Sequence, residues 1–475
     1  MKINPLSLKE VVRVTRGRLT GGTPGVVLTG ATLDSRQAEP GDLFIAVVGE
    51  RADGHHFVRD AFRRGAAAVL VQRWDEEVTG PAGEEAPGAV IRVADTAAAL
   101  GELAAWRRAS FNLPVVGVTG SVGKTSTKEM LAAVLATRYR TLKTEGNLNT
   151  EFGVPLTLLR LEATHEAAVL EMGMRGPGQI AELCRYGRPK VGVVTNVGPT
   201  HLELLGSIEN IARAKQELIN SLPPDGTAVL NGDDPWCREM AQATRARVLF
   251  FGREPAFGPE ITAREIQSRG AEGIGFVLVT PRGEAPVELP FPGEHQVKNA
   301  LAAAGGAYAL GLGPLDIATG LGAARNVAGR SQVREYGRVQ VIDDTYNASP
   351  ASTVAALGLL AELATGRKIA VLGNMLELGD YSDRGHREVG AEAARQGVDL
   401  LVTVGQLAAQ IAEGARSAGL PADRVVSCAG NPAALAELEP RLRAGDTVLV
   451  KGSRGMRMEE IVAGLRRRLE AGGQA

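Results

Sequence analysis

Apolar residues along this chain fall into short runs, separated by longer stretches in which they recur every three or four positions. Near the start, the runs Leu43–Val48 and Ala67–Val71 flank Phe57–Arg64, which has helical spacing. Short apolar runs are typical of buried strands, and recurrence at three to four positions is typical of helices. The pattern therefore predicts a small α/β domain over residues 1–108, closed by a helix over Thr96–Arg108.

The same alternation continues over residues 109–328. A helix is predicted over Ser207–Leu222, with its first residue as the N-cap. Alternating apolar residues over Ile261–Leu289 predict an antiparallel extension. An Ala-rich helix is predicted to run to Ala309 and to be interrupted at Gly305–Gly306.

Residues 329–475 repeat strand and helix, which predicts a parallel, doubly wound sheet of the Rossmann type. Together with the two preceding segments, this gives an α/β protein of three domains, over residues 1–108, 109–328 and 329–475. The predicted strands of the last domain are Val339–Asp343, Lys368–Leu372, Leu400–Val404, Arg424–Cys428 and Thr447–Val450.

Composition and charge narrow the class of protein. The 475 residues exceed one ordinary domain, and a formal net charge of -1 argues against a nucleic-acid-binding surface. The cysteines Cys184, Cys237 and Cys428 are far apart in apolar segments, so we interpret them as reduced core residues. No long apolar run opens the chain and none reaches the length of a membrane span. We therefore expect a cytoplasmic protein without membrane insertion.

One glycine-bearing turn carries the clearest chemistry. The run Leu113–Val118 predicts a strand, Gly120–Gly123 a turn, and Lys124 opens a helix that runs to Ala136. In this order, backbone N–H groups and the helix N-terminus cradle phosphates. Lys124 would reach the terminal phosphates, and the hydroxyl of Thr125 would bind Mg²⁺. The spacing departs from the general P-loop, because no glycine stands six residues before the lysine; a Gly-rich turn with a surface lysine is the alternative.

Polar residues also stand where predicted strands end. The run Ala167–Glu171 ends in a carboxylate, and the run that begins at Val191 leads to His201. Because ligands gather at the carboxyl ends of parallel strands, we expect Glu171 and His201 to meet a metal bound at the phosphates. The alternatives are a solvated rim glutamate and a structural histidine.

The last domain has three polar strand ends, at Asp343–Pro350, Gly373–Gly379 and Lys451–Arg454. Three such ends in one sheet favour a ligand-binding edge over three ordinary turns. The polar segments Asp34–Arg36 and Asp53–Phe57 of the first domain are interpreted as turns and N-caps.

Lys215 lies in the middle of an apolar helical face. Burial and nearby cations would disfavour its ammonium form, and a neutral amine can take up CO₂. The resulting carbamate has two oxygens, which suit Mg²⁺. The alternative is a lysine that extends from an apolar face to solvent. The residues of this face are Ile208, Ile211, Ala212, Leu218 and Ile219.

Together these motifs resemble the Mur ligase family over nearly the whole chain. The loop Gly117–Thr125 is similar to the family's ATP loop, whose glycine spacing departs from the general P-loop in the same way. The other stretches that carry the resemblance are Asn147–Thr150, Glu171–Gly173, Thr195–Gly198, His201–Glu203, Lys215, Gly293–Asn299, Gly329–Arg330 and Asp343–Ala348.

Within the family, His201–Ser207, Asp344–Ala348 and Met375–Gly379 resemble the members that add the dipeptide D-Ala-D-Ala. The Asp-Asn-Pro-Arg stretch typical of diaminopimelate-adding members does not occur. Two residues depart from the family pattern: Asn374 stands where Asp is expected, and Ser349 stands where Asn is expected.

The resemblance implies that the three domains bind a UDP-sugar, ATP and the incoming dipeptide, in chain order. It implies that ATP phosphorylates the terminal carboxylate of UDP-N-acetylmuramoyl-tripeptide and that the amine of D-Ala-D-Ala attacks the acyl phosphate, in cytoplasmic peptidoglycan precursor synthesis. The third residue of the tripeptide is lysine or diaminopimelate, and a monomer is expected. Another amino-acid-adding Mur ligase, a folylpolyglutamate synthase-like ligase and a nucleotide-gated binding protein without turnover are the alternatives.

The resemblance also assigns residues to roles. Lys124, Lys215, His201 and Glu171 are implied to be catalytic, with Thr125, Glu171, His201 and carbamylated Lys215 at the Mg²⁺ ions. The residues implied around ATP are Gly120, Ser121, Val122, Gly123, Lys124, Thr125, Ser126, Asn299, Arg330 and, on the ribose side, Asp344. Those implied around the other substrates are Ser35 and Arg36 at the uridine, Asn147 and Thr150 at the muramoyl end, and Tyr346 and Asn347.

Overall fold

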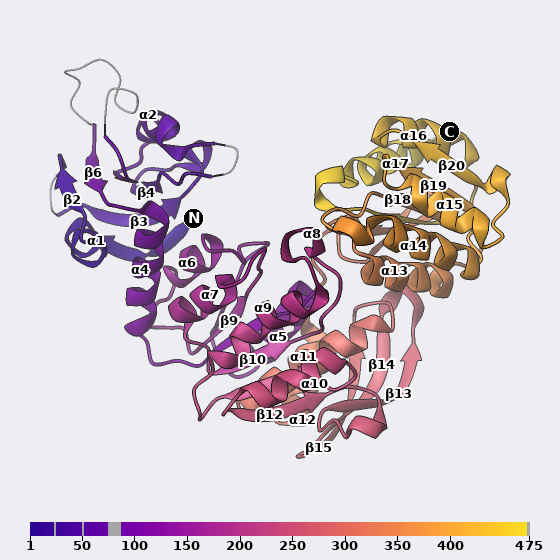
Figure 1. Ribbon diagram of the computed structural model, residues 1–475, viewed down its shortest axis with the longest axis horizontal. Helices are drawn as coiled ribbons and strands as arrows, with labels where there is room; N and C mark the ends of the chain where they lie inside the picture. Colours follow the sequence, from indigo (N-terminus) through magenta and orange to yellow (C-terminus); the bar gives the residue numbers. More distant parts are fainter. Residues whose placement is uncertain (23–24, 50–51, 75–86, 473–475) are drawn as a thin grey trace. The chain divides into compact units, whose positions relative to one another are not determined.

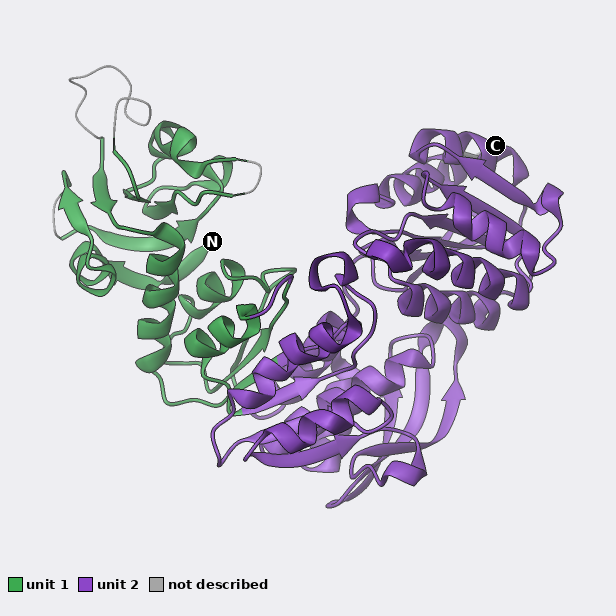
Figure 2. Ribbon diagram, viewed as in Figure 1, with its two compact units in different colours: residues 1–117, 139–174, 178–190 green, residues 118–138, 175–177, 191–475 purple. Residues whose placement is uncertain are grey.

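The computed structural model describes residues 1–22, 25–49, 52–74 and 87–472 as a mixed α/β protein (Figure 1). The chain forms two compact units (Figure 2). Unit 1 comprises Met1–Gly117, Tyr139–Met174 and Gly178–Lys190, and unit 2 comprises Val118–Arg138, Arg175–Pro177 and Val191–Ala475. The division falls within strand β7 (Val115–Thr119).

Unit 1 begins with a six-stranded sheet in the order β1-β3-β4-β5-β6-β2. Strands β3 to β6 are parallel, and the edge strands β1 and β2 are antiparallel to their neighbours. The predicted strands and helices of this region are confirmed, with ends shifted by up to three residues. The elements are β1 Lys2–Ser7, α1 Leu8–Thr15, β2 Arg18–Thr20, β3 Val27–Thr32, β4 Asp42–Ile45, α2 Val58–Arg63, β5 Ala68–Val71, β6 Ala89–Arg92 and α4 Thr96–Ala109.

The rest of unit 1 contains the parallel pair β8 and β9, which ends at Glu171. Two helices accompany it. The bounds are β8 Thr141–Lys143, α6 Gly153–Leu158, β9 Ala167–Glu171 and α7 Gln179–Gly187.

The first part of unit 2 contains the parallel strands β10, β11 and β12 and a separate three-stranded antiparallel sheet, β13-β14-β15. The second sheet is the predicted antiparallel extension. Ser207 caps helix α9 through its side chain, which confirms its predicted role. The elements are α5 Lys124–Leu135, β10 Val191–Val194, α8 Leu202–Leu205, α9 Ile208–Asn220, β11 Thr227–Asn231, α10 Pro235–Met240, β12 Arg247–Phe251, β13 Thr262–Ser268, β14 Ile274–Thr280, β15 Gly283–Leu289, α11 His295–Ala309 and α12 Pro314–Ala323.

The predicted interruption at Gly305–Gly306 is wrong, because α11 runs through both glycines without a break. Close packing explains these residues instead. A Cβ at Gly305 would lie 2.6 Å from Val229 Cγ1, and one at Gly306 would lie 3.1 Å from a methyl of Leu131. The glycines let α11 approach β11 and α5 closely, and this burial outweighs their low helix propensity.

The last part of unit 2 is a six-stranded sheet in the order β16-β17-β21-β18-β19-β20. The five predicted strands are confirmed as parallel, and β16 adds an antiparallel edge. Helices α13 to α15 share one hydrophobic core, and α16 and α17 share another on the opposite face (Figure 1). The elements are β16 Gln332–Tyr336, β17 Val339–Asp344, α13 Pro350–Leu363, β18 Lys368–Gly373, α14 Ser382–Arg395, β19 Leu400–Val404, α15 Ala409–Ser417, β20 Val425–Cys428, α16 Asn431–Leu438, β21 Thr447–Lys451 and α17 Glu459–Gly472.

Three further features complete the fold. None of the three cysteines forms a disulfide among the described residues, and all three are buried, as predicted. In the described ranges, no helix is both long and apolar enough to span a membrane. Short 3-10 helices occur at η1 Ser35–Gln37, η2 Gly54–Phe57, η3 Ala241–Ala243, η4 Pro255–Phe257, η5 Gly270–Glu272, η6 Gly379–Tyr381, η7 Ala422–Arg424, η8 Glu439–Arg441 and η9 Arg454–Met456.

Candidate active site

The glycine-bearing turn forms the predicted loop between β7 and α5. Gly120 and Gly123 have φ values of 149° and 85°, which side chains on L-residues rarely allow. A Cβ at Gly120 would lie 1.9 Å from Thr195 Oγ1, and one at Gly123 would lie 2.2 Å from Asn299 Oδ1. Only glycine therefore fits at both positions.

Residues after β10 hold this loop in place. The backbone N–H groups of Ser121 and Val122 donate to the backbone and side-chain oxygens of Asn196, both at 3.0 Å. Thr195 Oγ1 donates to the carbonyl of Val122 at 2.6 Å, and Lys124 Nζ donates to the carbonyl of Gly120 at 2.6 Å. The sequence pattern did not assign Asn196 a role, although it stands at a polar strand end.

Thr125 and Arg330 come together although they are 205 residues apart. An Arg330 guanidinium nitrogen donates to Thr125 Oγ1 at 3.3 Å, and the guanidinium lies over the Tyr346 ring, 4.0 Å from its centroid. Asn299 approaches the loop at Gly123, and its amide donates to Gln296 at 2.8 Å. The structure thus gathers Thr125, Asn299, Arg330 and Tyr346 near one loop.

His201 lies between α8 and the polar end of β18. Its Nδ1 contacts the carboxylate of Glu377, which also accepts from Arg175 at 3.2 Å. His201 and Glu377 both have positive φ, at 57° and 63°, which is uncommon for residues other than glycine. Burial lowers the pKa of His201, and Glu377 opposes this effect. The sequence pattern had placed Glu377 at a polar strand end without identifying His201 as its partner.

Lys215 is buried on α9, with 2% of its surface exposed, as its helical face predicts. Burial, followed by the positive charge of Lys124, lowers its pKa well below the ordinary value. Both effects favour the neutral amine.

Glu171 belongs to unit 1, at the end of β9, and only 2% of its surface is exposed. Asn149 Nδ2 donates to Glu171 Oε1 at 2.8 Å, and the Glu171 N–H donates to Thr144 Oγ1 at 3.1 Å. The predicted substrate residues Asn147 and Thr150 flank this amide and are exposed. Asn149 is therefore the residue of this segment that orients the carboxylate.

The segments Asp34–Arg36 and Asp53–Phe57 cap 3-10 helices η1 and η2, which confirms their interpretation as turns and caps. The buried Ser35 hydroxyl donates to Asp60 at 2.9 Å, whereas Arg36 is exposed and its guanidinium makes two hydrogen bonds to Asp34. Only Arg36 of the two predicted uridine residues therefore presents its side chain to solvent.

Asp53 is the centre of a charged cluster in unit 1. It accepts from His55 Nδ1 at 2.6 Å and from Arg73 at 3.0 Å. His55 Nε2 accepts from the Gln72 N–H at 2.9 Å, so the ring proton lies on Nδ1. Burial alone would raise the pKa of Asp53, but the bonds from His55 and Arg73 outweigh it and lower the pKa to about 2.

We expect Asp53→Asn to destabilise unit 1 by about 1 kcal/mol at pH 7. A depressed pKa stabilises the fold above the unfolded value of 3.8, and this contribution is lost as the pH falls to about 2. The difference in the free energy of unfolding between wild type and Asp53→Asn should therefore become smaller as the pH falls from 4 to 2. Urea unfolding with pulsed hydrogen exchange of β4 and β5 measures it; a difference that stays constant with pH would refute the assignment.

No group of three or more His, Cys, Asp or Glu side chains suited to a metal ion occurs in the part of the chain that the structure describes. The hydroxyl of Thr125 in unit 2 and the carboxylate of Glu171 in unit 1 are each oxygen donors of the kind that Mg²⁺ prefers.

Comparison with known proteins agrees with this arrangement. The Mur ligase middle domain model matches residues 118–307, and the Mur ligase, glutamate ligase domain model matches residues 329–454. A model described as Mur ligase family, catalytic domain, matches residues 27–108.

Individual relatives match over almost their whole length. The UDP-N-acetylmuramoyl-tripeptide–D-alanyl-D-alanine ligase of Bacillus subtilis is 40% identical over 464 residues, covering 97% of this chain and 98% of the relative. A crystal structure of MurF from Acinetobacter baumannii is 35% identical with a TM-score of 0.88, covering 98% of this chain and 100% of that one. The structure of MurF ligase from Thermotoga maritima in complex with ADP is 32% identical with a TM-score of 0.78, covering 93% and 98%.

Proposed function

The chain belongs to the Mur ligase family, and from that premise we propose that it joins D-Ala-D-Ala to UDP-N-acetylmuramoyl-tripeptide in an ATP-dependent reaction. It is an ATP-dependent ligase that forms a carbon–nitrogen bond. The observation that carries the proposal is the loop Gly120–Lys124, held by Asn196 and faced by Arg330. We propose that the protein acts in peptidoglycan precursor synthesis in the cytoplasm, and that it is a monomer.

Amide formation from a carboxylate requires activation, and the loop supplies what phosphoryl transfer needs. A terminal carboxylate oxygen of the tripeptide attacks the γ-phosphorus and ADP leaves with the bonding pair. The D-Ala-D-Ala amine then attacks the acyl carbon and loses a proton to solvent, and phosphate leaves as the tetrahedral intermediate collapses to the amide. Lys124 and the N-terminus of α5 neutralise the charge that accumulates on the phosphate oxygens.

Mg²⁺ completes this assignment. We propose that Thr125 and Glu171 hold one ion, and that His201 and a carbamate on Lys215 serve a second. When bound, Mg²⁺ neutralises phosphate charge and orients the reacting oxygens. The Asn149 amide fixes the Glu171 carboxylate, as partners of metal-ligating side chains commonly do.

We propose that the boundaries between the three domains follow residues 108 and 328. The first domain would bind the UDP-sugar, the second ATP and the third the dipeptide. Complete sheets before residue 93 and after residue 331 support the first and last domains. Asn299, Arg330 and Asp344 are proposed at the nucleotide. Ser35 and Arg36 are proposed at the uridine, Asn147 and Thr150 at the muramoyl end, and Tyr346 and Asn347 at the substrates.

The two departures from the family pattern have structural roles. Ser349 is the N-cap of α13 and forms a capping box with Ser352. Asn374 Oδ1 accepts from the Ala408 N–H at 2.9 Å, which ties β18 to the start of α15. An aspartate could accept the same bond, and an asparagine could cap the same helix. The residue that the family pattern expects could therefore make either structural contact as well.

The acceptor is expected to be D-Ala-D-Ala, preferred over single amino acids by at least roughly 10²-fold in kcat/KM. The Asp344–Ala348 stretch at the end of β17 motivates this expectation. An assay that crosses UDP-muramoyl peptides with candidate amines and follows ADP release measures it. Faster ligation of free lysine or diaminopimelate to the UDP-muramoyl dipeptide would identify a sister ligase, and ADP release without an amine would contradict ligation altogether.

A further inference from the structure

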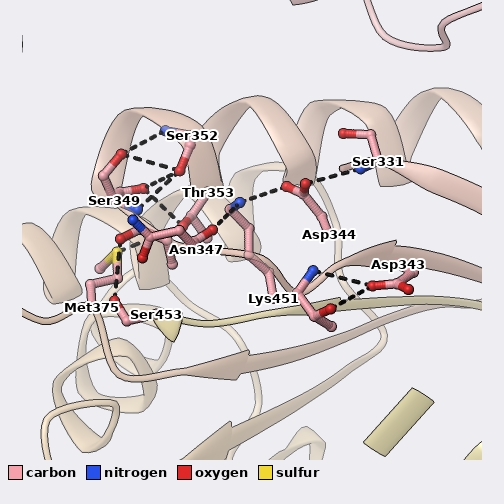
Figure 3. Close-up of polar contacts among 12 residues, drawn as sticks. Ser331, Asp343, Asp344, Asn347, Ser349, Ser352, Thr353, Met375, Lys451 and Ser453 are labelled. Atoms are coloured by element: carbon pink, nitrogen blue, oxygen red, sulfur yellow. Dashed lines mark hydrogen bonds and ion pairs between the residues drawn. The ribbon is translucent and has the colours of Figure 1, made fainter. Parts of the chain in front are cut away.

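Lys451 occupies a buried position between two neighbouring strand ends. It closes β21, beside Asp344 on β17, and 2% of its surface is exposed. Its Nζ donates to Asp344 Oδ2 at 2.6 Å and to the Asn347 carbonyl at 2.8 Å (Figure 3). One ammonium group therefore fixes both the end of β17 and the loop that follows it.

The second oxygen of Asp344 fixes the segment that enters the last sheet. Asp344 Oδ1 accepts from the Ser331 N–H at 3.0 Å (Figure 3). Ser331 is buried and has a φ of 49°, a conformation that residues other than glycine rarely adopt. Such backbone persists only where its surroundings determine it, and here the Asp344 carboxylate is the group that binds it.

Arg330 precedes this constrained residue and extends to the phosphate loop. Its guanidinium contacts the Tyr346 ring and Thr125, and the Tyr346 N–H donates to the Gly329 carbonyl at 3.1 Å. Contacts therefore run without interruption from Lys451 through Asp344 and Ser331 to Arg330 and the loop.

The same ammonium reaches the proposed acceptor side through the Asn347 carbonyl. Asn347 Oδ1 accepts from the Arg454 N–H at 3.4 Å, and Ser453 accepts from the Leu376 N–H at 2.9 Å. Lys451 thus stands between two groups of residues, one at the nucleotide and one at the polar ends of β17 and β18.

Charge makes this position sensitive to substitution. Burial alone would raise the pKa of Asp344, but the charge and hydrogen bond of Lys451 outweigh it and hold the pKa below its ordinary value. The carboxylate is therefore ionised, and Lys451 stabilises that charge more than Arg330 or His295 does. Removing Lys451 leaves the buried carboxylate without its hydrogen-bonded cation, which is costly.

We propose that Lys451 is a positioning residue that sets the Arg330–Ser331 segment at the nucleotide and the Tyr346–Asn347 segment at the acceptor from one buried ammonium group. The inference rests on the proposed function for the identity of the two ligands. The contacts of Lys451, Asp344 and Arg330 support this positioning role whatever the two ligands are.

Lys451→Met removes the cation while retaining similar length. We expect KM for ATP and KM for D-Ala-D-Ala to rise together by about tenfold, within the usual range for coupled sites. KM for the UDP-muramoyl tripeptide should stay within twofold of wild type, since its proposed residues lie in unit 1. The double variant Asp344→Asn, Lys451→Met should raise these two KM values by less than the product of the factors found for the single variants, because both substitutions act on one contact.

Arg367→Met is the matched control. Arg367 pairs with buried Asp446 at the opposite end of the same sheet, at 2.7 Å. Its loss removes an ion pair to a buried carboxylate, although the Arg367 side chain is itself 30% exposed. We expect lower thermal stability, but all three KM values should remain unchanged. Equal KM values in Lys451→Met and Arg367→Met would reduce Lys451 to a stabilising residue and overturn the proposal.

A second readout needs no turnover. In the ligand-free protein, Lys451→Met should speed amide hydrogen exchange at residues 329–332 and 344–348, whereas Arg367→Met should not. If Lys451→Met does not fold, Lys451→Arg keeps the cation but replaces a compact ammonium by a larger planar group at this buried position. It should then show smaller increases in amide exchange at the same residues. Unchanged exchange in the folded variant refutes the proposal. Wild-type protein that releases no ADP would instead refute the proposed function alone.

Discussion

Lys124→Ala is expected to lower kcat/KM for ATP-dependent ligation by about 10²–10³-fold or more. The lysine is the first residue of α5, and its Nζ lies against the carbonyl of Gly120 in the glycine loop. Removing the charge would leave the proposed phosphate site without the lysine of its loop. The fold should be retained, because this side chain is only half-buried and contributes a charge and not core packing.

Lys190→Ala supplies the control for this experiment, since Lys190 is an exposed lysine directly before β10. It should ligate at the wild-type rate. Circular dichroism and thermal melting of both variants separate loss of chemistry from loss of structure. Wild-type turnover by Lys124→Ala would mean that the loop is not the phosphate site.

Local features of the fold could be predicted because they depend on neighbours in sequence. The apolar runs became strands within three residues of their predicted ends, and Ser207 and Asp53 cap the helices that follow them. The phosphate loop belongs to the same class, since its strand, turn and helix are consecutive. Each of these follows from spacing and side-chain type alone.

Contacts across the molecule could not be predicted in this way. His201 meets Glu377 across 176 residues, and Asp344 meets Lys451 across 107. The second contact exists because β21 inserts between β17 and β18, although it is the last strand of the chain. Apolar periodicity does not encode strand order, so Lys451 could be placed at a polar strand end but not beside its partner.

Tertiary packing also reversed one local rule. Gly305–Gly306 suggested a break, yet the helix continues because the missing side chains let it approach β11 and α5. Two edge strands, β2 and β16, could not be predicted from the apolar pattern either. β2 and β16 are short and lie partly exposed, so they lack the continuous apolar run of a buried strand.

Lys215→Ala is expected to lower kcat by at least about 10²-fold, because we propose that the active enzyme carries a carbamate at this position. The side chain is buried, and burial together with the Lys124 charge lowers its pKa, so the neutral amine is favoured. The amine nitrogen then bonds to the carbon of CO₂, one C=O electron pair moves to oxygen, and a proton leaves to solvent. The product is an anion with two oxygens, which suits Mg²⁺ in a way that an ammonium does not.

Chemical rescue distinguishes this role from simple packing. Acetate or formate can occupy the space left by Lys215→Ala and present two carboxylate oxygens, so either should restore part of the lost activity. Arg213→Ala is the control on the same helix, because Arg213 is exposed and should neither lose activity nor respond to the acids. Mass spectrometry of the wild type under CO₂ should show a labile adduct on Lys215. Full activity of Lys215→Ala in CO₂-free buffer would exclude the carbamate, since the alanine can form none and no carboxylic acid is there to replace it.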